Sequence, residues 1–236
     1  MRAVEKRNRT QLDDILELPN YSPAEAARYF HIAPSTLEYW TDIDRPLVAL
    51  PSTRPKLLSF KNLVELYVLE GLRREGLRTR DIRTAVEYLL NNEKSRHPLA
   101  DFDLRTLDRQ HLVFCRGKHT LNASLCGQYE IAEWVMPYLK RVDRDPHGKA
   151  KKIFPFLTKS QIDADADPPR SVLIDPNICF GLPVLAGSRI TTGFIASRYR
   201  GGDSLMAIAN SYDRSVAEIK EAIEWETGKE IRQEAA

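Results

Sequence analysis

The chain contains 236 residues, of which 42% are hydrophobic and 29% are charged, and its formal net charge is +2. This length allows one large domain or two to three small ones, each with a modest core. No apolar run approaches the length of a membrane span, and the charged start lacks the apolar core of a signal peptide. We therefore expect a cytoplasmic protein without a membrane partner. The odd number of cysteines (Cys115, Cys126 and Cys179), which show no paired-ligand spacing, argues against a disulfide framework.

Residues 22–40 predict two short helices joined by a tight turn, an arrangement that can lay its second helix in the DNA major groove. Ser22 is suited to cap the first helix, Pro23 to occupy its first position and Glu25 to complete a capping box. Pro34 then opens the second helix. An ordinary helical hairpin with a solvated face is the alternative for these residues.

The spacing of the second helix turns Leu37 and Trp40 inward. Ser35, Thr36 and Tyr39 are then left on its outward face, where small polar and aromatic side chains can meet phosphates or base edges. These three residues are the first candidate DNA contacts.

A proline-rich segment with basic residues follows this helix pair. Residues 45–55 contain three prolines and cannot be helical, so we expect a short hairpin or wing that touches the DNA backbone. The basic residues Arg45 and Arg54 of this segment, and Lys56 directly after it, join the candidate DNA contacts. Two further helices are expected, one capped by Ser59 and one capped by Thr79.

The ordered set of a helix pair, a wing and two more helices has a family resemblance. The runs YSPAEAARYFHIAPSTLEYW and LSFKNLVELYVLEGLRREGLRTRDIRTAVEYL, with the proline-rich wing between them, resemble the winged helix-turn-helix of the MerR family. The resemblance implies a domain over residues 1–93 that binds operator DNA as a homodimer through the positions named above. One departure is that the chain turns to Pro98 and an alternating segment, where MerR regulators usually continue into a long dimerising helix.

Residues 94–157 predict a small β-rich connecting domain, followed by a polar linker over 158–170. We expect a hairpin over 102–114, a strand over 121–125, a helix over 129–142 and a strand over 151–156. This region also carries the basic surplus of the chain, much of it in the run Lys140, Arg141, Arg144, Lys149, Lys151 and Lys152. The run could follow phosphates, meet an acidic protein or simply be a solvated helix end before the turn at residues 146–148.

No pattern in the chain favours catalysis, so we predict a protein that is not an enzyme and holds no metal or cofactor. The histidines at 97, 111, 119 and 147 lack metal-ligand spacing. The glycine-rich run over 181–187 has no lysine after its second glycine, which excludes a phosphate loop. Neither Ser124 nor Ser188 lies in a nucleophile elbow.

Residues 171–228 predict a β-hairpin followed by a second helix-turn-helix. Short strands are expected at 172–174 and 184–185, a helix at 192–199, and a helix pair capped by Asp203 and by Ser215 with Glu218. The last helix is expected to expose Glu218, Glu221 and Glu224, which phosphate would repel. This helix pair therefore has the shape of a DNA-binding motif, but its acidic charge favours binding to a protein. The overall expectation is a mainly α protein with small β elements, of the α+β class.

The C-terminal motifs IDPNICFGLPVLAGSRIT, GGDSLMAIANSY and SVAEIKEAIEW resemble a short domain shared by a family of predicted bacterial antitoxins. Joined to a MerR-like domain, this module resembles VapB-type antitoxins, whose genes accompany PIN-domain (VapC-type) ribonuclease toxins. The resemblance implies two activities, which are repression of the shared operon and neutralisation of the toxin. A stand-alone MerR-like regulator is the main alternative, and a small-molecule-binding or enzymatic protein is another.

A PIN-type toxin would present carboxylates that hold magnesium, and arginines are suited to enter or cover such a cleft. The candidates for this role are Arg189, Arg198 and Arg200, which flank the turn and helix before Gly201. An arginine that follows Gly-Ser, as Arg189 does, could instead serve only to tie two strands together.

Overall fold

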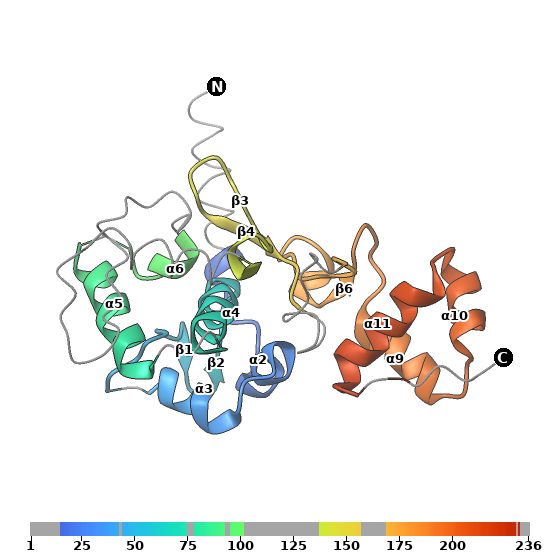
Figure 1. Cartoon of the computed structure of the whole chain (residues 1–236), viewed down its shortest axis with the longest axis horizontal. Coiled ribbons are helices and arrows are strands. Elements are labelled where there is room, and N and C mark those ends of the chain that lie inside the picture. The colour runs from blue at the N-terminus through green and yellow to red at the C-terminus, as the bar shows by residue number, and fades with distance from the viewer. Residues whose placement is uncertain are drawn as a thin grey trace. The chain divides into compact units, whose positions relative to one another are not determined.

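Helices supply most of the regular structure, and short two-stranded sheets supply the rest (Figure 1). The structure is a computed structural model that describes residues 15–42, 44–74, 78–92, 95–101, 137–156, 169–229 and 231. The expected α+β class with a mainly helical content is confirmed. The chain divides into two compact units, residues 1–151 and 152–236. Within the described residues, no helix is long and apolar enough to cross a membrane.

The first unit begins with the predicted helix pair, α2 (Pro23–Phe30) and α3 (Pro34–Trp40). The capping box is confirmed, because the Ser22 hydroxyl accepts from the Glu25 backbone N–H at 3.2 Å and Glu25 accepts from the Ser22 N–H at 2.8 Å. Helix α2 ends at His31, which takes a left-handed conformation with φ 54°. The Ile32 N–H then donates to the Ala27 carbonyl at 2.9 Å and closes the turn between the helices.

The expected wing is a β-hairpin. Strands β1 (Ser52–Thr53) and β2 (Lys56–Leu57) pair antiparallel, with Ser52 opposite Leu57 and Thr53 opposite Lys56. Arg54 and Pro55 form the connection between the strands, which places the Arg54 side chain at the exposed tip. The prediction of a short hairpin in this segment is therefore confirmed.

Helix α4 (Phe60–Arg74) lies at the centre of the first unit (Figure 1). Ser59 caps it as expected, because its hydroxyl accepts from the Asn62 N–H at 3.3 Å. Every residue of α4 from Phe60 to Leu72 is buried, as helices α2, α5 (Thr79–Asn92) and α6 (Pro98–Asp101) pack around it. The other elements of this unit thus take their positions from α4.

Burial of α4 encloses charged side chains, each of which has partners of opposite charge. Lys61 lies 2.7 Å from Glu17 and 3.0 Å from Asp101, and Glu65 lies 3.0 Å from His97 Nδ1. Burial opposes the charge on Lys61, but its two carboxylate partners outweigh this effect and raise its pKa. Removing one partner of such a buried pair costs about 3–5 kcal/mol, because it leaves an uncompensated charge. These pairs therefore fix α6 and the segment before α2 against α4.

The pair of Glu65 and His97 predicts a dependence of stability on pH. Burial opposes protonation of His97, but the hydrogen bond and charge of Glu65 outweigh it and raise the pKa of His97 above 6.5. The stabilisation that protonated His97 gives to the folded chain is therefore complete below pH 6.5. It is lost as the pH rises through the higher pKa that His97 has in the folded chain. Burial also raises the pKa of Glu65. Ionisation of this buried carboxyl costs free energy, so it too lowers the stability of the folded chain as the pH rises.

We expect the free energy of unfolding of the wild-type chain to fall as the pH rises above about 6.5, and this slope to flatten in His97→Gln. Urea unfolding at several pH values measures it. His147→Gln, which alters an exposed histidine, is the matched control and should keep the wild-type slope. An unchanged slope in His97→Gln would contradict the assignment.

Gly71 permits a close approach between α4 and Tyr138. A Cβ at position 71 would lie only 2.6 Å from Cγ and 2.8 Å from Cδ1 of the Tyr138 ring. Tyr138 is 2% exposed, and its ring centroid lies 5.4 Å from that of Tyr67 on α4. Glycine in a helix interior is normally unfavourable, so this contact explains its presence here.

Gly71→Ala is therefore expected to lower the free energy of unfolding. Overpacking costs about 1–3 kcal/mol, whereas the gain in helix propensity is about 1 kcal/mol. Gly193→Ala is the control, since a Cβ there would meet Glu226 Oε1 at an ordinary 3.7 Å, and this variant should be neutral or stabilising in urea unfolding. The same effect from both substitutions would refute the role of the Tyr138 ring.

The segment after Tyr138 differs from the expected helix. Residues 137–139 are helical, but strand β3 (Val142–Arg144) follows after a turn and pairs with β4 (Ala150–Ile153). The helix expected to reach residue 142 thus ends earlier, and the strand expected at 151–156 ends at Ile153. Pro155 lacks the N–H that a longer ladder would need. The turn expected at residues 146–148 joins the two strands. The hairpin expected at 102–114 and the strand expected at 121–125 lie outside the described residues.

The second unit starts within β4, where Ile153 bridges to Ile174. Strands β5 (Val172–Leu173) and β6 (Val184–Leu185) pair antiparallel and are followed by helices α9 (Thr192–Arg200), α10 (Leu205–Tyr212) and α11 (Val216–Thr227). The predicted strands and helices are confirmed with small shifts at their ends. Their shared core consists of Leu185, Ile195, Ile208, Ala209, Ile219, Ala222 and Ile223.

The sequence predicts a cap for each of the helices α10 and α11. The capping box of Ser215 and Glu218 is confirmed, with Glu218 accepting from the Ser215 N–H at 2.9 Å. The cap expected at Asp203 is wrong, because Ser204 caps α10 by accepting from the Ala207 N–H at 3.1 Å. Asp203 instead pairs with Arg198.

The described parts of residues 94–157 contribute to both units. Helix α6 and Tyr138 pack on α4, whereas Ile153 pairs with the second unit. The boundaries expected at residues 93, 157 and 170 stay predictions, and most of the expected linker lies outside the described residues.

Candidate DNA-binding and protein-binding surfaces

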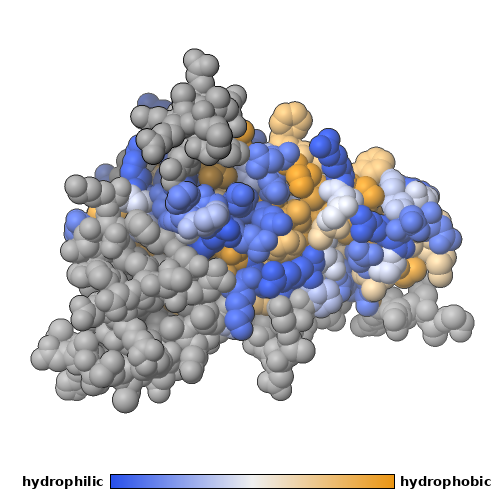
Figure 2. Space-filling view, turned by 90° about the horizontal axis from the view of Figure 1, so that it is seen from above, coloured by the Kyte–Doolittle hydropathy of each residue, from blue (hydrophilic) through white to orange (hydrophobic). Residues whose placement is uncertain are grey.

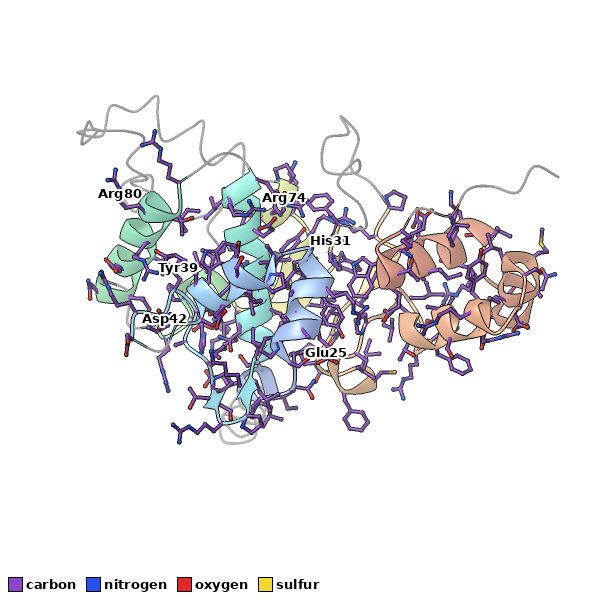
Figure 3. All side chains as sticks on the ribbon, turned by 90° about the horizontal axis from the view of Figure 1, so that it is seen from below. Glu25, His31, Tyr39, Asp42, Arg74 and Arg80 are labelled. Atoms are coloured by element: carbon purple, nitrogen blue, oxygen red, sulfur yellow. The ribbon has the colours of Figure 1, made fainter. Side chains whose placement is uncertain are left out.

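The outward face of α3 carries the first three candidate DNA contacts. Ser35 and Tyr39 are exposed and Thr36 is half-buried, while Leu37 and Trp40 are 3% and 0% exposed. The capping and packing of α2 and α3 thus direct Ser35 and Tyr39 toward solvent and Leu37 and Trp40 into the core, as predicted. Figure 3 shows Tyr39 on α3, with Asp42 just beyond the end of that helix.

Tyr39 and Arg45 both contact α5. The Arg83 guanidinium lies 5.2 Å from the centroid of the Tyr39 ring and donates to the Arg45 carbonyl at 2.7 Å. Arg45 pairs with Glu87 at 3.4 Å, but both side chains are largely exposed, so this pair adds little stability. Arg83 is a cation beside the candidate surface that the sequence analysis missed, because only the packed structure brings residues 39 and 83 together.

The wing contributes Arg54 and Lys56 beside α3. Arg54 is exposed at the hairpin tip, and Lys56 is half-buried on β2. Lys56 borders the same cavity as Leu37 and Glu38, so the hairpin and α3 form one surface. Cations on this surface suit phosphates, and the outward face of α3 suits base edges.

A cavity of about 570 Å³ lies between α2, α3 and β2. Most of its lining is apolar, with Arg28, Glu38 and Lys56 as its charged residues. The volume is within the range of small-molecule sites. Its full lining is Pro23, Ala24, Ala27, Arg28, Ile32, Pro34, Leu37, Glu38, Thr41 and Lys56.

Arg74 fixes the end of α2 against α4. Its guanidinium donates to the Phe30 carbonyl at 3.3 Å and pairs with Glu70 at 2.7 Å. A cation at the C-terminal end of a helix compensates its free carbonyl groups. Figure 3 shows Arg74 near His31, which begins the turn to α3. This contact helps to set the direction in which α3 leaves α2.

The three candidate toxin-binding arginines have different surroundings. Arg189 is exposed, and no ion pair is found for it within the described part of the chain. Arg198 lies 2.6 Å from Asp203 and 5.3 Å from the Tyr212 ring centroid. The hydrogen bond to Tyr212 and the pair with Asp203 raise the pKa of Arg198. Arg200 is exposed and donates to the Ala196 carbonyl at 3.3 Å.

The acidic side chains of α11 are not the open face that the sequence predicted. Glu218 caps its own helix and pairs with Arg214, and the N–H of Ser215 lowers the pKa of Glu218. Glu221 accepts from the Ser171 hydroxyl, and Glu224 accepts from the Ile231 N–H at 2.7 Å. The prediction failed because these carboxylates are half-buried and form hydrogen bonds within the unit.

The turn η1 (Cys179–Gly181) presents an aromatic side chain beside Arg189. Cys179, Phe180 and Gly181 all have positive φ, and Phe180 is 89% exposed. The left-handed conformation costs about 1–2 kcal/mol for each L-residue. The Cys179 thiol donates to the Arg189 carbonyl at 3.3 Å, so this turn and the start of the arginine-bearing segment lie together. Phe180 is not among the site residues predicted from the sequence.

Exposed apolar side chains occur elsewhere on the surface, and on the face shown in Figure 2 hydrophobic residues lie among hydrophilic ones. In the second unit they include Leu182, Phe194 and Met206, which are 44%, 55% and 59% exposed. Phe194 stacks edge-on against Tyr212, with ring centroids 6.5 Å apart. The described residues contain no group of three or more His, Cys, Asp or Glu side chains that could hold a metal ion.

Comparison with known proteins gives similarities to a family model, to a named protein and to a solved structure. A family model described as "Protein of unknown function (DUF433)" matches residues 172–225. A protein of Mycobacterium tuberculosis (strain ATCC 25618 / H37Rv) named "Putative antitoxin VapB45" is 26% identical over 243 residues, which cover 91% of this chain and 96% of that protein. The crystal structure of Rv2018 from Mycobacterium tuberculosis matches with a TM-score of 0.68 at 24% identity, covering 88% of this chain and 99% of that one. This chain shares the fold of that structure.

Proposed function

We propose that this chain is the antitoxin of a type II toxin-antitoxin system. The observation that carries the proposal is its similarity, along nearly the whole length of both proteins, to the protein named "Putative antitoxin VapB45". The partner would be a PIN-domain (VapC-type) ribonuclease toxin, and the chain would act in the cytoplasm as a binding protein without catalysis. The match of a separate family model to residues 172–225 supports a distinct role for the second unit.

The second activity we propose is repression of its own operon by binding operator DNA as a homodimer. The capped helix pair α2 and α3 with the β-hairpin wing, which is the arrangement that the resemblance to the MerR family implies, supports this activity. The DNA contacts would be Ser35, Thr36 and Tyr39 on α3 with Arg45, Arg54 and Lys56 around the wing. Arg83 would supply a further cation, because it lies against the Tyr39 ring.

The toxin-binding contacts we propose are Arg189, Arg198 and Arg200. Arg189 and Arg200 are exposed and suited to meet carboxylates of a partner. Arg198 contributes through the loop that it holds, since it already pairs with Asp203.

A stand-alone MerR-like regulator is the second candidate function, and the cavity between α2 and α3 favours it. A small molecule bound there would lie beside the outward face of α3 and alter DNA binding. Such a regulator would show a ligand that raises the melting temperature and changes DNA affinity in the absence of a protein partner.

Toxin binding is tested by co-expressing the tagged chain with the product of the adjacent gene. We expect the two to purify as a stable complex and growth arrest by the toxin to be relieved. Arg189→Glu with Arg200→Glu should weaken the complex by about 2 kcal/mol or more, because like charges would meet at the interface. Isothermal calorimetry measures the difference in affinity.

The role of Arg198 is tested separately by the exchange Arg198→Asp with Asp203→Arg, which retains the internal pair while moving its charges. It should bind more tightly than Arg198→Asp alone. Full binding by the double charge reversal at positions 189 and 200 would show that the toxin uses another surface.

DNA binding is tested by the salt dependence of operator affinity. Arg54→Ala with Lys56→Ala should weaken binding to specific and random DNA alike and reduce the salt slope by about one for each phosphate that is no longer neutralised. Tyr39→Ala should instead change the sequence preference. Equal weakening on specific and random DNA for Tyr39→Ala would remove this residue from the recognition surface.

A further inference from the structure

The turn η1 holds a large aromatic side chain in a conformation that the free chain does not favour. Phe180 has φ 57° between Cys179 at 48° and Gly181 at 79°, a region that only glycine enters readily. A bulky residue is rare in this conformation and normally requires compensation. The ring is 89% exposed, so most of its apolar surface is open to solvent.

Backbone hydrogen bonds fix the turn in this shape. The Gly181 N–H donates to the Ile178 carbonyl at 2.9 Å, and the Leu182 N–H donates to the Cys179 carbonyl at 3.1 Å. The thiol of Cys179 reaches the Arg189 carbonyl, which links the turn to the neighbouring segment. Phe180 is therefore a projecting ring on a defined backbone, which loses less conformational freedom on binding than a side chain on an unstructured loop.

The charge next to this ring indicates the kind of surface that it would meet. Arg189 is exposed and its carbonyl accepts from the Cys179 thiol, which places this basic residue beside the turn. A partner that receives the ring and the guanidinium together must offer an apolar pocket with a carboxylate at its edge.

We infer that Phe180 is an anchor residue that inserts into an apolar pocket of the toxin, with Arg189 meeting a carboxylate at the rim of that pocket. This inference rests on the proposed function, since it names the contact by which the second unit holds its partner. Leu182, which is 44% exposed and follows the turn, extends the apolar contact. Buried aromatic residues at the centre of an interface commonly carry most of its binding energy.

The substitution Phe180→Gly is expected to change the stability of the chain and its affinity for the partner in opposite directions. Glycine accepts the left-handed conformation at no steric cost, so this variant should have a higher urea midpoint than the wild-type chain. It should nevertheless bind the adjacent gene product at least about 30-fold more weakly, because the anchoring ring is gone. Phe180→Ala should lose affinity to a similar degree without the gain in stability. Met206→Ala removes another exposed apolar side chain, on α10, and should keep the wild-type affinity.

Calorimetric titration of the full chain with the adjacent gene product distinguishes the outcomes. Wild-type binding with equal affinity for Phe180→Gly would overturn the anchor while leaving the proposed function intact. Absence of any wild-type binding would overturn both. A loss of operator DNA affinity in Phe180→Gly, with toxin affinity retained, would also overturn the anchor and assign the turn to DNA instead.

Discussion

A helix that is buried on all sides can carry charged residues only if its neighbours supply the opposite charges, and α4 imposes this constraint on the first unit. Lys61, Glu65 and Glu70 are nearly inaccessible, and their partners come from before α2, from the segment that leads into α6 and from the end of α4 itself. Each partner must occupy a defined place, since an unpaired buried charge is costly. The pairs therefore specify one arrangement of the surrounding elements.

The candidate DNA surface depends on this arrangement. Arg74 on α4 holds the end of α2, and the capped turn at His31 then sets the course of α3. Helix α5 supports the other side, where Arg83 covers the Tyr39 ring. A surface that reads DNA must be rigid relative to its phosphate contacts, and here the rigidity originates in the packing around α4.

The second unit follows a different principle. Its core is apolar, and its turn η1 projects an aromatic ring at the cost of backbone strain. Strained backbone persists where surrounding structure over-determines it, and it gathers at functional positions. The two units thus differ in the way that two binding tasks would require.

Local signals in the sequence predicted much of the fold. Both capping boxes, at Ser22 and Ser215, and the prolines of the wing are short-range features, and the structure confirms them. The outward positions of Ser35 and Tyr39 followed from helical spacing. The sequence did not reveal contacts between distant positions, such as Glu65 with His97 or Tyr39 with Arg83.

The left-handed turns were also missed. His31 and Phe180 occupy conformations where glycine is expected, so composition gives no sign of them. Half-burial of Glu221 and Glu224 was not foreseen either, because helical spacing shows which residues share a face but not what covers that face. Part of the candidate site, including Phe180, therefore could be identified only from the structure.

The division of tasks between the units is tested most directly by site-specific photo-crosslinking. A photoreactive phenylalanine analogue replaces Tyr39 in one preparation and Phe180 in another, each mixed with both operator DNA and the adjacent gene product. The account predicts crosslinks from position 39 to DNA alone and from position 180 to the protein alone. Crosslinks from both positions to the same partner would contradict it.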